Sequence, residues 1–103
     1  MSENETPQTP PDEHELPPVH FEELVYPLVL QAEAHLGLLG APEGEEKPKP
    51  NFIFARRAID LLALLQEKTQ GKLTYDEQRF LDNSLTELRF RYLHVLEESK
   101  KSA

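Results

Sequence analysis

The segment from Phe52 to about Gln70 constrains the fold most, because it is apolar around most of its circumference. Its main stripe follows the three- and four-residue steps of an amphipathic helix: Phe54, Ala55, Ala58, Leu61, Leu62 and Leu65. Further apolar residues fall on its other sides: Ile53, Ile59, Ala63 and Leu64. Such a helix needs cover on more than one side, so we expect it to pack against several partners.

A tight turn is predicted to join this helix to another one. In "KTQGKLT", Lys68 to Thr74, the lysine after the glycine is not followed by a hydroxyl residue, and the string follows a helix rather than a strand. Both features exclude a phosphate-binding loop. Gly71 is expected to close the first helix as the residue after its C-cap, and Thr74 and Glu77 have capping-box spacing. With Asn51 as the N-cap of the first helix, these signals predict a hairpin of helices over 52–70 and 75–98.

An additional helix is predicted over 20–39, where apolar residues again share one stripe: Phe21, Leu24, Val25, Leu28, Ala32, Leu36 and Leu39. Pro27 lies inside this pattern and predicts either a kink or a fresh helix start near Tyr26. Gly37 and Gly40 are the candidate C-caps. Residues 40–50, rich in proline and glycine, form a flexible linker.

We therefore expect one helical domain over 20–98, preceded by an acidic, proline-rich disordered tail over 1–19 and followed by a frayed end over 99–103. The tail carries five acids and no Lys or Arg, whereas residues 51–103 carry eight acids and nine Lys or Arg. A net charge of −8 argues against nucleic acid as the main partner. The longest apolar run is too short for a membrane span, and the first residues lack the features of a signal peptide.

Composition also limits the chemistry. Because the chain has no cysteine, it has no disulfide, thiolate or sulfur-ligated metal site, which fits a cytoplasmic location. The "DEHE" string, Asp12 to Glu15, lies in the expected tail, which cannot hold metal ligands rigidly. His35 falls within an apolar stripe and reads as a hydrogen-bonded histidine at the border of the core. We predict no catalytic residue, no cofactor and no metal.

The excess of apolar surface predicts a contact face. The candidate interface residues are Phe54, Ile59, Leu64 and Phe90. A hairpin of this size is marginal as a lone core, so dimerisation into a helical bundle is expected to complete it. The alternative is a factor associated with RNA or the ribosome, for which the contact residues would be Arg56, Arg57, Arg89 and Arg91.

The segment "ARRAIDLLALLQEKTQGKLTYDEQRFLDNSLTELRFRY", Ala55 to Tyr92, resembles the bacterial domain-of-unknown-function family eighteen forty-four. The resemblance rests on the Ala-Arg start, the Ile-Asp and leucines, the Lys-Thr-x-Gly-x-Leu-Thr string and the closing Leu-Arg-x-x-Tyr. An upstream part, Phe21 to Gly37, is similar to the first segment of that family. The resemblance implies a small bacterial helical protein of unknown activity, with the ribosome as a candidate association.

The sequence as a whole predicts an all-α protein, with a kinked N-terminal helix and a long antiparallel helical hairpin. We expect it to act as a protein-interaction or self-assembly module without catalysis. A homodimer is the expected state, and a foreign protein is the other candidate partner.

Overall fold

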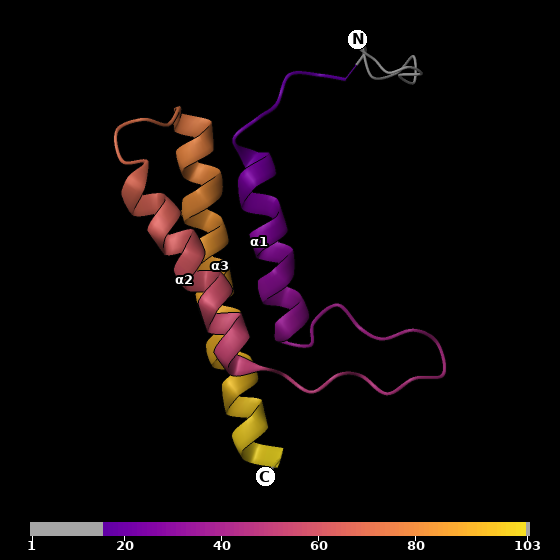
Figure 1. Cartoon of the computed structure of the whole chain (residues 1–103). Helices are drawn as coiled ribbons and strands as arrows, with labels where there is room; N and C mark the ends of the chain where they lie inside the picture. Colours follow the sequence, from indigo (N-terminus) through magenta and orange to yellow (C-terminus); the bar gives the residue numbers. More distant parts are fainter. Residues whose placement is uncertain (1–15, 103) are drawn as a thin grey trace.

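The computed structural model describes residues 16–102, which form three helices and no strand (Figure 1). Helix α1 spans Glu22–His35, α2 spans Phe52–Lys68 and α3 spans Tyr75–Ser102. The all-α prediction is confirmed. Residues 1–15, which include "DEHE" and most of the expected tail, lie outside the described part.

The chain passes along the molecule three times (Figure 1). α1 lies beside part of the hairpin, the segment between α1 and α2 loops out and returns, and α2 and α3 form an antiparallel hairpin in which α3 extends past the end of α1. α1 packs more extensively against α2 than against α3. α1 therefore supplies part of the cover that α2 requires.

The core lies where the three helices meet. Its buried members are Val25 and Ala32 of α1, Ala58, Ile59 and Leu62 of α2, and Leu81, Leu85 and Leu88 of α3. Alanines at the contacts of α1 and α2 permit close approach of the two helix axes. The three leucines of α3 complete the same cluster.

Pro27 is accommodated inside α1, since the helix begins at Glu22 and continues to His35. The predicted fresh start near Tyr26 is therefore wrong. The apolar stripe is also narrower than predicted, because Leu24 and Leu39 are exposed. Leu24 is adjacent to the buried Val25, so its side chain points away from the helix axis in a different direction. Leu39 lies beyond the end of α1 at His35, so the helical spacing does not apply to it.

The end of α1 and the start of α2 are tied together at the backbone. Gly37, at φ +77°, donates its N–H to the carbonyl of Ala34 at 3.0 Å, and the N–H of Leu38 reaches Glu33 O at 2.9 Å. These two bonds form the predicted glycine C-cap of α1. Asn51 donates its N–H to His35 O at 2.7 Å, and its Oδ1 accepts from the N–H of Phe54 at 3.1 Å. One residue therefore satisfies groups of both helices.

The turn between α2 and α3 differs in one detail from the prediction. α2 ends at Lys68 with Thr69 as its C-cap, so the C′ residue is Gln70, and Gly71, which was predicted to be C′, lies one residue further on. Gly71, at φ +75°, instead shapes the turn in which the N–H of Lys72 donates to Thr69 O at 2.9 Å. The hydroxyl of Thr69 donates to Leu65 O at 2.7 Å, the same carbonyl that accepts the Thr69 N–H at 3.1 Å.

The capping box at the start of α3 is confirmed. The N–H of Thr74 donates to Glu77 Oε1 at 2.9 Å, and the N–H of Glu77 donates to Thr74 Oγ1 at 3.2 Å. α3 then continues to Ser102, beyond the predicted end near Glu98, so residues 99–102 are helical. Residues 40–50 contain no helix or strand.

We predict that Gly37→Ala lowers the free energy of unfolding by about 2 kcal/mol. A Cβ there would occupy a left-handed conformation and lie 3.1 Å from Pro48 O, a backbone atom. Gly40→Ala is the matched control, because Gly40 has φ +82° but no atom within 4 Å of its Cβ position. Urea denaturation of both variants measures the difference. An equal loss in the two variants would contradict the role of the Pro48 contact.

Candidate interaction surface

The outward side of α2 carries a stripe of four residues, Ile53, Arg57, Asp60 and Leu64, which we name the outer stripe. Steps of four, three and four residues place them in one line along the helix. All four are exposed, with Ile53 at 79% and Leu64 at 48%. The buried residues Ala55, Ile59 and Leu62 occupy the opposite side of α2. Neither α1 nor α3 therefore covers the outer stripe.

The four predicted interface residues have different positions. Leu64 belongs to the outer stripe, and Phe90 is 70% exposed on α3. Phe54 is exposed near α1, where its ring centroid lies 5.4 Å from that of His35. Ile59 is only 6% exposed and belongs to the core, so its placement away from the core stripe was wrong. Ile59 lies on the side of α2 that faces α3. Ile53 lies on a different side of α2 and is exposed.

A shallow depression lies between α2 and α3 beside the outer stripe. Its lining residues are Arg56, Ile59, Asp60, Arg89, Tyr92 and Leu93. Arg56 Nε lies 4.0 Å from Asp60 Oδ2, and both side chains are largely exposed, so this pair is weakly held. Tyr92 is fixed from the α2 side, where its ring meets Phe52 edge-on with centroids 5.6 Å apart. The depression combines an apolar floor with two arginines and one carboxylate.

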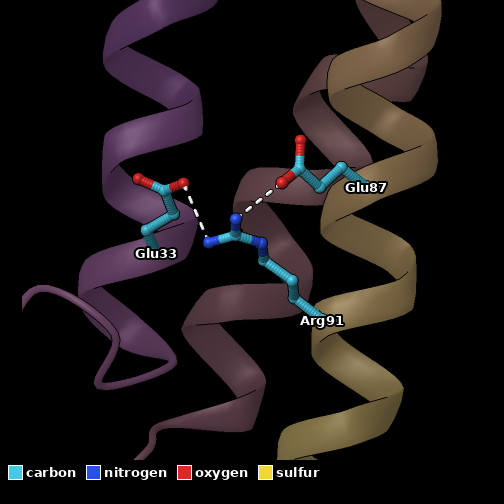
Figure 2. Close-up of polar contacts among 3 residues, drawn as sticks. All are labelled: Glu33, Glu87 and Arg91. Carbon is cyan, nitrogen blue, oxygen red and sulfur yellow. Dashed lines mark hydrogen bonds and ion pairs between the residues drawn. The ribbon is translucent and has the colours of Figure 1, made fainter.

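Two of the four arginines proposed for RNA contact thus meet in one place. Arg56 and Arg89 line the depression, and Arg57 lines a neighbouring one with Phe52 and Ile53. Arg91 is separate from this group because it turns toward α1. Figure 2 shows its guanidinium between two carboxylates, with Nη2 at 2.6 Å from Glu87 Oε2 and Nη1 at 3.6 Å from Glu33 Oε2. Arg91 therefore links α3 to α1, as well as pairing with Glu87 one turn away on α3.

A polar contact between α2 and α3 was missed by the sequence reasoning. Asp82 Oδ1 accepts from Gln66 Nε2 at 2.7 Å and from Gln78 Nε2 at 2.9 Å, and these contacts are partly buried. The four-residue spacing of Gln78 and Asp82 could have indicated half of this cluster. Gln66 could not be paired from sequence, since its position opposite Asp82 depends on how the hairpin packs. Hydrogen bonds within the hairpin thus occupy this carboxylate.

Within residues 16–102 no group of three or more His, Cys, Asp or Glu side chains is placed to hold a metal ion. No helix in the same range is long and apolar enough to cross a membrane.

The fold and surface of residues 16–102 define a class: a small all-α fold of three helices with an uncovered helix face. Residues 18–94 match the family described as Domain of unknown function (DUF1844), and the chain belongs to that family. The match includes all of α1 and α2 and most of α3, so it covers the whole helical core. Comparison with curated proteins and with solved structures finds no match to the chain.

We predict that Arg91→Ala and Glu33→Gln each lower the free energy of unfolding slightly, with a coupling energy of about 0.2–1 kcal/mol. Both side chains are partly solvated, so water screens the pair that joins α3 to α1. A double-mutant cycle in urea denaturation measures the coupling, and Arg91→Ala with Glu87→Gln gives the comparison within α3. A coupling of zero between Arg91 and Glu33 would contradict their role in holding α1.

Proposed function

We propose that the chain is a protein-interaction module that acts by self-association and performs no catalysis. The observation that carries the proposal is the apolar surface left on the outer sides of the hairpin. Ile53 is 79% exposed on α2, and Phe90 and Leu93 are 70% and 60% exposed on α3. These residues remain open although α1 already covers the other side of the hairpin.

Covering this surface would provide the free energy of association. Each large aliphatic or aromatic side chain contributes about 1.5–3 kcal/mol when it is fully buried. The helices that carry these side chains are held by the core, so binding would cost little backbone ordering. A rigid helix face with apolar residues at helical spacing is a recurrent mode of protein recognition.

The absence of catalysis is part of the proposal. The depression between α2 and α3 is lined by arginines, a carboxylate and apolar side chains, with no serine or histidine among its lining residues. Its carboxylate, Asp60, lies at the open surface near Arg56 rather than in an enclosed cavity. A cytoplasmic location is also proposed, on the support of a chain without cysteine.

We predict that the full chain forms a dimer, and that Ile53→Asp and Leu64→Asp weaken it. Each change places a charge on the surface that the dimer would bury, whereas both positions are exposed in the single chain and should not affect folding. Light scattering coupled to size exclusion gives the mass, and circular dichroism gives the helicity. Phe90→Asp tests in the same way whether α3 belongs to the contact.

Val19→Asp is the control, because Val19 is 87% exposed and precedes α1, so it belongs to neither helix of the hairpin. A monomeric full chain at all concentrations would contradict self-association. Dimers unchanged in the three hairpin variants would contradict the assignment of the surface. Ile59→Asp is unsuitable for this test, since Ile59 lies in the core and its replacement would unfold the chain.

A second candidate function is RNA binding, because Arg56 and Arg89 meet at one depression together with Tyr92. Arginines beside an aromatic ring can contact phosphate and stack on bases. If this alternative holds, Arg56→Ala with Arg89→Ala abolishes RNA binding that weakens steeply with salt. Filter binding to a mixed-sequence single-stranded RNA measures it, with Arg79→Ala as the control. The net charge of −8 and the nearby Asp60 oppose binding to a polyanion, so RNA binding stays the second candidate.

A further inference from the structure

The order of residue types along the outer stripe of α2 is self-complementary when two copies of the stripe run in opposite directions. From Ile53 to Leu64 it is apolar, positive, negative and apolar. Ile53 and Leu64 are equidistant from a point between residues 58 and 59, and Arg57 and Asp60 are equidistant from the same point. A twofold axis at that point, perpendicular to the helix, would therefore exchange the members of both pairs.

Two copies of α2 that pack antiparallel about this axis would satisfy every member of the stripe. Ile53 would face Leu64 of the second copy, and Arg57 would face Asp60 of the second copy, with each contact occurring twice. The apolar pairs would flank the ion pairs and lie about 16 Å apart along the helix, from the rise of 1.5 Å per residue. Such an isologous contact is the usual symmetry of protein dimers.

The same pattern opposes parallel packing. In a parallel pair at equal register, Arg57 would face Arg57 of the second copy, and Asp60 would face Asp60. Two like-charge contacts at an interface are unfavourable, so the charges select the antiparallel orientation.

The charged members of the stripe are available for such a contact. Across residues 16–102, Arg57 makes no hydrogen bond or ion pair, and the only ionic neighbour of Asp60 is Arg56 at 4.0 Å. Both carbon chains emerge from the side of α2 opposite to the core, between two exposed apolar residues. A second copy could approach without displacing α1 or α3.

We propose that α2 docks against α2 of a second copy in this antiparallel register, with the pairs Ile53–Leu64 and Arg57–Asp60 at the contact. The inference rests on the proposed self-association and specifies its partner, surface and orientation. A contact between two four-turn helices is at or below the low end of the area that stable interfaces bury. The dimer is therefore reversible and depends on protein concentration.

Charge reversal and its rescue test the register. Arg57→Asp places two acids opposite each other at both symmetric contacts, and Asp60→Arg does the same with two bases. Each single change raises the dissociation constant of the dimer about tenfold. The double variant Arg57→Asp/Asp60→Arg restores opposite charges and returns the constant to within about threefold of the original. Sedimentation velocity over a range of concentrations measures all four proteins.

Arg79→Asp is the matched control, because it reverses one exposed arginine on α3 and gives the same net charge as Arg57→Asp. It leaves the dissociation constant unchanged, and circular dichroism verifies that every variant keeps its helices. The proposed register is overturned, but self-association is not, if Arg57→Asp and Arg79→Asp change the dissociation constant equally. The same conclusion follows if the double variant does not restore the dissociation constant. A wild-type chain that stays monomeric overturns both the register and the proposed self-association.

Discussion

The structure depends on the packing of α1 against α2. A hairpin of α2 and α3 alone would leave Ala55, Ala58 and Leu62 partly open, because one helix covers only one side of another. α1 closes that side with Val25 and Ala32, and its last turn is fixed to α2 by the hydrogen bond from Asn51 to His35 O. Residues 40–50 can then remain without helix or strand, since both of their ends are already anchored.

This packing also determines which surface is left for function. With α1 on one flank of α2 and α3 on the other, only the side opposite the core remains open, and that side carries the outer stripe. The two apolar positions of the stripe provide binding energy, while Arg57 and Asp60 provide orientation. Arg91, in contrast, is used within the molecule to hold α1 and α3 together. Arginines of the same helical hairpin thus have different roles: Arg57 faces outward and is assigned to the contact, whereas Arg91 faces α1 and stabilises the fold.

Much of the fold could be predicted because its signals are local. Asn51, Gly37, Thr74 and Glu77 make the predicted capping contacts, since a cap depends on residues within one turn. The sequence could not show whether Ile59 faces the core or the solvent. On a helix that is apolar on most sides, the hydrophobic pattern does not identify the buried side until the neighbouring helices are known. The contact between Gln66 and Asp82 and the link from Arg91 to Glu33 also depend on helix packing, which periodicity alone does not specify.

The most direct measurement is the distance between spin labels on two copies of α2. The chain has no cysteine, so Glu67→Cys provides a single attachment point near the end of α2, three residues beyond Leu64 and outside the four proposed contact residues. Antiparallel docking about the point between residues 58 and 59 places the two labels about 25–30 Å apart. Labels about 10–20 Å apart would indicate parallel packing, and no dipolar coupling at high protein concentration would show that α2 does not pair with itself. Either result would contradict the account.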